Sequence, residues 1–212
     1  MKKICLSVMA LVIACMFLGC KQEEQEPTLL YIEPAQLTEE ERNILSLIGR
    51  EPDPYIYDFV LDSSVQSVQV NIYELVDGTW ELISGGGGMA LSNAQGRIAL
   101  EFENLIGQGY QRIAIQSDDN SSSTSHTPGA EVDSSSIGHA TSMLDDRTNI
   151  VYEQEIPLLL QIATAKNQIL SYGIDAFYTP EAYEKYGYEH VYAVTVRFSQ
   201  KTVLENSQEA SV

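Results

Sequence analysis

The sequence predicts a mainly β domain, an antiparallel β-sandwich with one or two short helices, and three observations lead to this prediction. Apolar and polar residues alternate with a period of two in several short segments. Turn signals separate these segments at hairpin spacing. The 212 residues are 44% hydrophobic and 20% charged, a composition that suits one folded domain rather than a disordered chain. A partly open β-barrel is the competing architecture.

The clearest hairpin begins at residues 68–72, where apolar and polar side chains alternate as in a half-buried strand. Asp77-Gly78 supplies the turn, and residues 79–83 run back. The glycine-rich stretch 84–88 lacks both the nucleophile elbow of hydrolases and the ending of a phosphate-binding loop. We therefore expect it to be a flexible loop.

Further strands follow along the chain. Residues 98–102 and 113–115 form a second pair, and residues 149–165 give one or two strands in which Pro157 marks a bend or an edge position. Residues 191–198 close the set, with the even-numbered side chains on one face. A single domain is thus expected over residues 31–204.

Two short helices are predicted outside these strands. Thr38 and Glu41 form a capping box at the start of an amphipathic helix over residues 39–48. A second helix is expected within residues 178–187. The residues that would cap, begin and end this second helix are Thr179, Pro180 and Gly187.

Two segments lack the apolar residues that a folded element needs. The serine-rich stretch 117–142 predicts a mobile loop between two strands, and residues 205–212 predict a frayed tail. Asp118 and Asp119 lie at one end of this loop, with Asp145 and Asp146 just beyond the other. These carboxylates could bind a Ca²⁺ ion that joins the two ends of the loop. No EF-hand register is present, however, and the carboxylates of acidic loops are usually only hydrated. No other cofactor is expected.

The first residues have the composition of an export signal. Met1-Lys2-Lys3 is a short basic start, and the residues from Ile4 to Gly19 carry no charge. This run is shorter than the roughly 20 apolar residues that span a bilayer, and an abrupt acidic stretch follows Cys20.

The tetrad Phe17-Leu18-Gly19-Cys20 resembles the lipobox of bacterial lipoprotein signal peptides, although its first residue is not the usual aliphatic one. Members of that family carry a diacylglyceryl group on the cysteine, which becomes the new N-terminus. The resemblance implies a signal peptide over 1–19, a lipid-anchored acidic tether over 20–30, and a place on the bacterial cell membrane facing outside the cytoplasm. Cys15, in a better-matching tetrad, is the alternative, followed by an ordinary cleaved signal or an uncleaved anchor.

The net charge and the positions of the cysteines argue against several classes of function. The formal net charge of −18 argues against nucleic-acid binding, which needs clustered Lys and Arg. All three cysteines lie within the first 20 residues, so a chain cut at Cys20 would have no disulfide and no cysteine nucleophile. The three histidines show no zinc-ligand spacing, and we predict no catalytic residue.

Tyrosine is the most distinctive component, because six of the twelve tyrosines lie between residues 172 and 192. Tyr183, Tyr186 and Tyr188, with Trp80 as a neighbour, are the candidate ligand-binding residues, because tyrosine suits sugar rings and protein partners. The competing interpretation, which we favour, is that the tyrosines pack the helical insertion onto the sheet.

These observations predict a non-enzymatic, lipid-anchored domain that binds a ligand or a protein partner outside the cytoplasm. A glycan-binding module is the first alternative and rests on the tyrosines. A carboxylate-based extracytoplasmic hydrolase is the second, supported only by Glu101 and Glu103 on one strand and by the aspartates.

Overall fold

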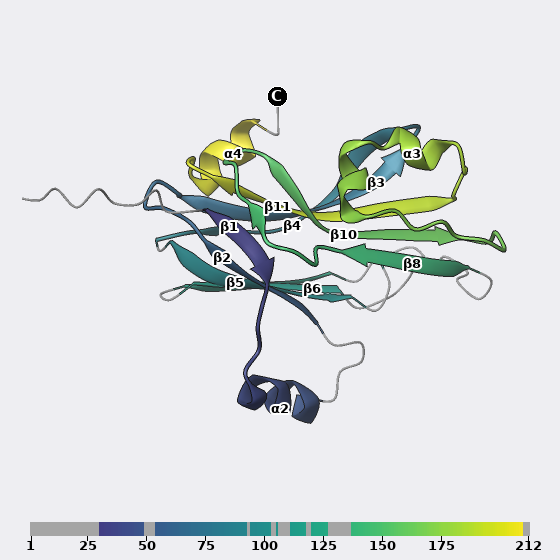
Figure 1. Cartoon of the computed structure of the whole chain (residues 1–212). Coiled ribbons are helices and arrows are strands. Elements are labelled where there is room, and N and C mark those ends of the chain that lie inside the picture. Colours follow the sequence, from purple (N-terminus) through teal and green to yellow (C-terminus); the bar gives the residue numbers. More distant parts are fainter. Residues whose placement is uncertain are drawn as a thin grey trace, which may run out of the picture.

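The computed structural model describes residues 30–48, 54–92, 94–102, 105, 111–117, 120–126 and 137–209. The described strands form two antiparallel sheets that pack face to face, so the predicted β-sandwich is confirmed (Figure 1). Sheet A has the strand order β7-β6-β5-β2-β1-β9, and sheet B has the order β4-β3-β11-β10-β8.

Each sheet combines strands from distant parts of the chain. Sheet A comprises β1 (Tyr31–Pro34), β2 (Tyr55–Val60), β5 (Gln95–Phe102), β6 (Gln111–Ser117), β7 (Ser121–His126) and β9 (Thr148–Asn149). Sheet B comprises β3 (Ser67–Val76), β4 (Thr79–Ala90), β8 (Gly138–Met143), β10 (Glu155–Thr164) and β11 (His190–Ser199). The helices are α2 (Glu39–Ile48), the 3₁₀ helix η2 (Ile174–Tyr178), α3 (Glu181–Glu184) and α4 (Val203–Glu209).

The predicted hairpin is β3–β4. Asp77 and Gly78 have φ values of 48° and 77°, which are the left-handed conformations of a tight two-residue turn. The flexible loop expected over residues 84–88 is wrong, because β4 continues through the glycines to Ala90. Backbone pairing with β3 carries the strand through this stretch, and register shifts on either side of Ile72 absorb its irregularity.

Strand β10 shows why Pro157 is tolerated inside a sheet. The register with β11 shifts between Pro157 and Leu159, as in a β-bulge. On the other side β8 pairs with β10 only from Leu159 onward, so the ring of Pro157 faces no partner strand there. The register shift and the missing partner on one side agree with the bend or edge position that the sequence predicts for this proline.

The main core lies between the two sheets. Phe59 of sheet A meets Phe198 of sheet B with ring centroids 5.0 Å apart. The even-numbered residues 192–198 of β11 belong to this core, as predicted. Val191 and Ala193 point to the other face of sheet B and join a second apolar cluster there.

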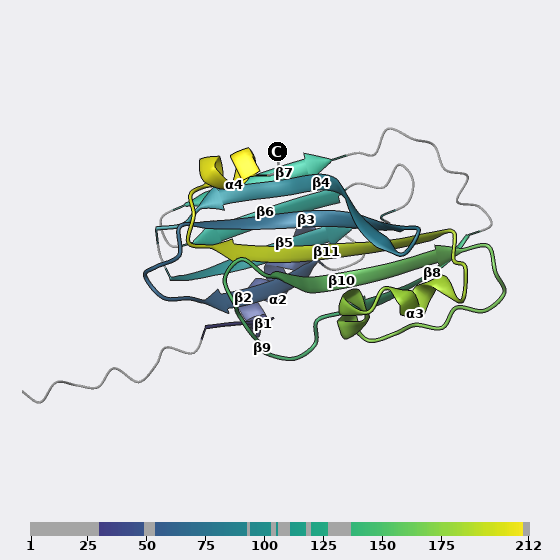
Figure 2. The same cartoon turned by 90° about the horizontal axis from the view of Figure 1, so that it is seen from above.

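That second cluster lies beneath a cap formed by residues 165–189, which include η2 and α3. Figure 2 shows the cap over one end of sheet B and α4 over the other. The helix expected within residues 178–187 is present but shorter, because α3 covers only Glu181–Glu184 and the 3₁₀ helix η2 precedes it. Pro180 is the N-cap of α3 and not its first residue. The N–H of Thr179 bonds back to the carbonyl of Ala176, so Thr179 closes η2 instead of capping α3. Gly187, at φ 53°, still ends the turn that follows α3.

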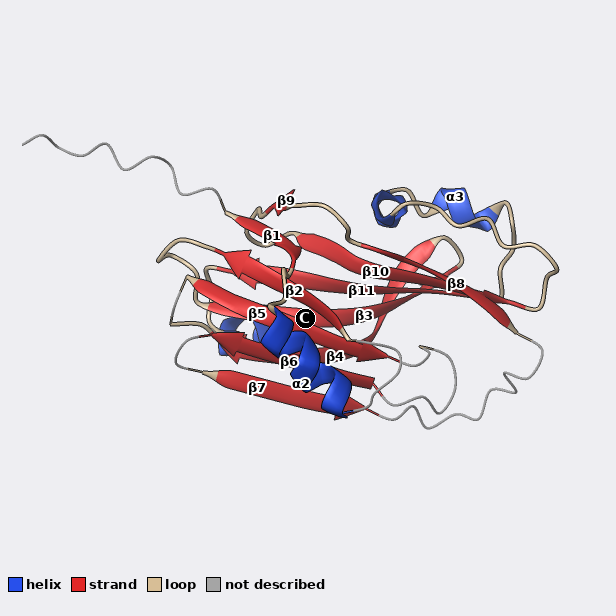
Figure 3. Cartoon of the chain, turned by 60° about the horizontal axis from the view of Figure 1, so that its bottom comes forward, coloured by secondary structure: helices blue, strands red, loops and turns tan. Residues whose placement is uncertain are grey.

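Helix α2 has the predicted bounds and the predicted capping box. The N–H of Thr38 donates to Glu41 Oε2 at 2.7 Å, and the N–H of Glu41 donates to Thr38 Oγ1 at 3.2 Å. The helix stands away from sheet A (Figure 1), and it lies in front of that sheet when the bottom of the molecule is turned forward (Figure 3).

Two predictions of irregular structure are wrong over those of their residues that the structure describes. Within the serine-rich stretch 117–142, β7 pairs with β6 and β8 pairs with β10, while residues 118–119 and 127–136 lie outside the described ones. Polar side chains do not prevent edge pairing, because the backbone supplies the hydrogen bonds.

The frayed tail is instead helix α4 as far as Glu209, so the domain continues past residue 204. Thr202 and Glu205 form a second capping box, with the N–H of Thr202 donating to Glu205 Oε2 at 2.7 Å. Asn206 is 7% exposed and donates to Ser67 Oγ at 3.0 Å, which fixes the helix on sheet B.

Candidate functional site

Two of the four predicted ligand-binding residues hold the cap in place. Tyr183 is 2% exposed and packs edge-on against Tyr172, with ring centroids 5.2 Å apart. Trp80 stacks on Phe177 at 5.2 Å, and its indole N–H donates to the Phe177 carbonyl at 2.9 Å. These contacts agree with the packing interpretation for Tyr183 and Trp80, and neither residue lines the pocket formed by the other two tyrosines.

The other two tyrosines form a separate feature at the edge of the cap. Tyr186 and Tyr188 are half-buried, and their rings stack with centroids 5.7 Å apart and an interplanar angle of 17°. They border a pocket of about 370 Å³. Its lining residues are Lys166, Asn167, Gln168, Leu170, Tyr186 and Tyr188.

Local contacts fix this pair of rings. The backbone N–H of Leu170 donates to the Tyr188 hydroxyl at 2.9 Å, and Lys166 Nζ donates to the Tyr186 carbonyl. Lys166 Nζ also lies 5.8 Å from the Tyr188 ring centroid, and Lys185 Nζ lies 4.8 Å from that of Tyr186. The pocket thus has a rigid aromatic wall held by the segment that follows β10.

Two positively charged side chains lie beside the aromatic pair, although the chain as a whole is acidic. The chain carries a net charge of −18, yet Lys166 and Lys185 both contact this aromatic pair. The side chain of Tyr172, whose ring centroid lies 5.9 Å from that of Tyr186, and then Lys185 lower the pKa of Tyr186. Burial raises the pKa of Tyr183 to about 12, as expected for a core residue.

Sequence reasoning missed four lining residues, namely Lys166, Asn167, Gln168 and Leu170. The available signal was a polar run directly after the apolar β10 and just before the first tyrosine of the cluster. This signal is weak, because polar residues after a strand usually indicate only a turn. The return of the chain at Tyr186–Tyr188 is what makes these residues a pocket.

A second polar cluster surrounds Glu155 on the outer face of sheet B. Its Oε1 accepts hydrogen bonds from Asn71 Nδ2 at 2.9 Å and from the Tyr73 hydroxyl at 3.1 Å, while Thr195 Oγ1 donates to Oε2. Burial, and then Glu155, raise the pKa of Tyr73 to about 12. These bonds join β10 to β3 and β11, so this carboxylate has a structural role.

The proposed calcium ligands do not come together in the part of the chain that the structure describes. Asp145 and Asp146 are exposed in the turn between β8 and β9, while Asp118 and Asp119 lie outside the described residues. No group of three His, Cys, Asp or Glu side chains among the described residues could hold a metal ion.

The structure describes only one of the two glutamates on which the hydrolase alternative rests. Glu101 lies opposite Arg112 in the β5–β6 register and borders a groove under α2, whereas Glu103 lies outside the described residues. Cys15 and Cys20, the candidate lipidation sites, also lie outside them. None of the described helices combines the length and the apolarity needed to cross a membrane.

Comparison with known proteins adds no relative. The chain matches no protein family model, no curated protein and no solved structure.

Proposed function

We propose that this protein is a lipid-anchored, non-enzymatic domain on the outer side of a bacterial cell membrane, and that it binds a glycan in the Tyr186–Tyr188 pocket. The observation that carries the glycan proposal is the stacked pair Tyr186–Tyr188 in one pocket with the polar residues Lys166, Asn167 and Gln168. Support for the anchor comes from the lipobox-like tetrad that ends at Cys20.

The chemistry of the pocket suits a sugar ring. Aromatic faces pack against the apolar C–H face of a sugar, while amide and ammonium groups bond its hydroxyls. Asn167, Gln168 and Lys166 supply those polar groups beside the rings. The volume of about 370 Å³ lies in the range of small-ligand sites. Because Tyr188 is already held by Leu170, little ordering is needed on binding.

The same lining favours binding over acid–base catalysis. None of the six described lining residues is a carboxylate, a histidine or a cysteine. A hydrolase of the carboxylate type needs two acidic groups flanking the scissile bond. The pocket therefore supports a binding module better than a hydrolase.

The glycan proposal is tested by calorimetric titration of residues 21–212, which retain every described residue, with a panel of neutral and acidic oligosaccharides. We expect one glycan class to bind, and Tyr186→Ala and Tyr188→Ala each to weaken that binding at least tenfold, because each removes half of the aromatic wall. Tyr178→Ala is the matched control, since Tyr178 is 57% exposed on the same cap and does not line the pocket.

A melting temperature within about 2 °C of the unchanged protein would show that the variants fold, since about 1 kcal/mol moves the melting point of a domain this size by roughly 2–4 °C. Binding of no glycan in the panel, or equal binding by the Tyr186 and Tyr188 variants, would contradict the proposal.

A further inference from the structure

Helix α2 exposes a large apolar flank. Ile44, Leu47 and Ile48 are 58%, 86% and 60% exposed, and no residue of the helix is buried. Figure 1 shows the helix standing off the outer face of sheet A, beyond the body of the sandwich. An apolar stripe of this kind on a surface helix usually packs against something.

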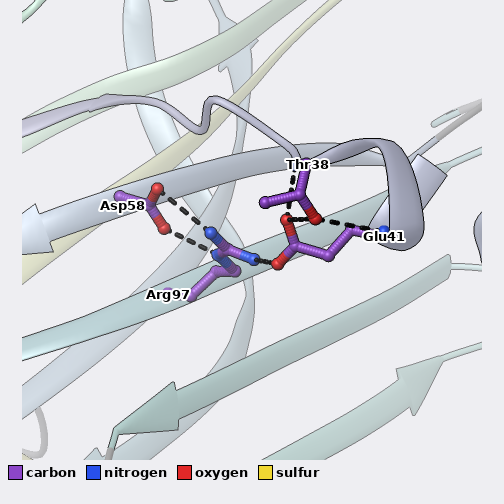
Figure 4. A network of polar contacts seen from close by, with 4 residues as sticks. All are labelled: Thr38, Glu41, Asp58 and Arg97. Atoms are coloured by element: carbon purple, nitrogen blue, oxygen red, sulfur yellow. Dashed lines mark hydrogen bonds and ion pairs between the residues drawn. The ribbon is translucent and has the colours of Figure 1, made fainter.

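Ion pairs hold the helix in this position. Arg97 Nη1 lies 2.6 Å from Glu41 Oε1, and the same guanidinium contacts both carboxylate oxygens of Asp58, with Nε 2.6 Å from Oδ1 (Figure 4). Glu41 is at the same time the acidic member of the capping box. The orientation of α2 is therefore set by polar contacts at its first turn rather than by burial of its apolar stripe.

The apolar stripe of α2 consists of Ile44, Leu45, Leu47 and Ile48, and sheet A lies against only part of it. A space of about 250 Å³ lies between α2 and sheet A, with Leu45 and Ile48 on the helix side and the small side chains of Ala99 and Ala114 on the sheet side. Ile44 and Leu47 do not line this space. Leu45 thus faces the sheet, and Ile48 borders the space while it is still 60% exposed, whereas Ile44 and Leu47 lie outside the space and are exposed.

We propose that Ile44, Leu47 and Ile48, which we call the α2 flank, lie on the surface of the bilayer that holds the lipid anchor. This inference rests on the proposed anchor at Cys20. Only nine residues separate Cys20 from Leu30, so the anchor lies at most about 35 Å from the start of the domain. Helix α2 begins nine residues after Leu30, at most about 30 Å along the chain. The anchor and the helix can therefore reach the same leaflet.

The negative charge of α2 and of the whole chain indicates which kind of bilayer surface the helix can approach. Glu39, Glu40 and Glu41 occupy the first turn of α2, and the whole chain is strongly acidic. An anionic surface would repel such a helix, so the partner is a zwitterionic lipid surface. Attachment then depends on three apolar side chains entering the interface, as a second contact that adds to the acyl chains.

The test is flotation of residues 21–212, which lack the anchor, with phosphatidylcholine vesicles and with vesicles that also contain phosphatidylglycerol. We expect partition onto the zwitterionic vesicles and weaker partition onto the anionic ones. The double variant Ile44→Ser, Leu47→Ser should lower the partition at least tenfold. Leu204→Ser is the matched control, because Leu204 is a 76% exposed leucine on the other short helix, α4. All of these side chains are exposed, so the melting temperature should not change.

Two results would overturn the inference. The first is absence of vesicle binding, or binding that the double variant does not change. The second is a concentration-dependent dimer in sedimentation equilibrium that the double variant abolishes, since a second copy would then cover the flank. The anchor is tested separately by labelled-palmitate incorporation in cells, where Cys20→Ser should lose the label and Cys15→Ser should keep it. A labelled protein whose domain does not float refutes the α2 contact alone, and an unlabelled protein whose domain floats refutes the anchor alone.

Discussion

At the scale of the single residue, Gly96 shows how tightly the two strands beside it approach. A Cβ at this position would overlap the ring of Phe59 and would lie 2.5 Å from the carbonyl oxygen of Gln116. Phe59 is 1% exposed and forms part of the core between the sheets. The ring and the backbone cannot both move away, so this position requires glycine for space.

We therefore predict that Gly96→Ala lowers the free energy of unfolding by about 2–3 kcal/mol, as overpacking does in a filled core. Gly173→Ala is the matched control, because that site has no atom within 4 Å and its φ of −61° suits alanine. There we expect no change or a gain of up to about 1 kcal/mol. Urea denaturation of both variants measures the difference, and an equal effect at the two sites would contradict this interpretation.

The tyrosines show that the residue type alone does not decide whether a side chain packs in the core or borders a pocket. Tyr183 and Tyr186 lie three positions apart on the same turn, yet one is a core residue and the other borders a pocket. Both have an apolar ring and a hydroxyl, so composition and spacing favour packing and binding alike. Both rings contact Tyr172, so the burial of Tyr183 in the folded cap, and not any property of its side chain, separates the two roles.

At the scale of the element, α2 and α4 begin with the same local motif. Thr38–Glu41 and Thr202–Glu205 each form a capping box, and both helices are short. The pattern of apolar residues supports the first box, whereas the residues after 205 are polar and favour a frayed tail over a helix. The motif itself needs only four residues, so the same local signal stands at the start of both helices, but only at α2 does the apolar pattern that follows predict a helix.

The first of these boxes gives α2 a pH dependence. The Thr38 backbone N–H, and then Arg97, lower the pKa of Glu41 to about 2. A depressed carboxyl pKa means that the charged contact is intact above about pH 4.5 and is lost as the pH falls toward 2. We predict that pepsin cleavage within α2 becomes faster over this window, when normalised to an unstructured peptide at each pH.

Glu41→Gln provides the control for this prediction. Without the charge, the contact with Arg97 is weak at every pH, so normalised cleavage of α2 in that variant should be fast and nearly independent of pH. A wild-type cleavage rate that stays flat from pH 4.5 to 2 would show that the Glu41–Arg97 contact does not hold the helix.

At the scale of the whole molecule, the two sheets are joined through their inner faces. The ring contact between Phe59 and Phe198 crosses from sheet A to sheet B and lies within one continuous apolar cluster. Sheet B also carries the second cluster beneath the cap, to which Phe177 belongs. The sandwich should therefore unfold as a unit, with stronger coupling across the main core than between the core and the cap.

A double-mutant cycle tests this coupling. We predict that Phe59→Leu and Phe198→Leu show an interaction free energy of about 0.5–1.5 kcal/mol, because the ring pair is lost in either single variant. Phe59→Leu combined with Phe177→Leu should be additive within about 0.5 kcal/mol, since a β-sheet separates the two rings. Additivity in the first cycle would show that the aromatic contact does not couple the sheets.

The sequence by itself determined the features that depend on neighbouring residues. Period-two alternation predicted the main strands and both faces of β11, Asp77-Gly78 predicted the hairpin, and the capping box predicted α2, because each is fixed within a few residues. Only the tertiary structure decided that glycines 85–88 and the serines of β7 are strands, because partner strands supply their hydrogen bonds. It also decided that Lys166, Asn167 and Gln168 meet Tyr186 and Tyr188, since contact across about 20 residues follows from how the cap folds back on sheet B.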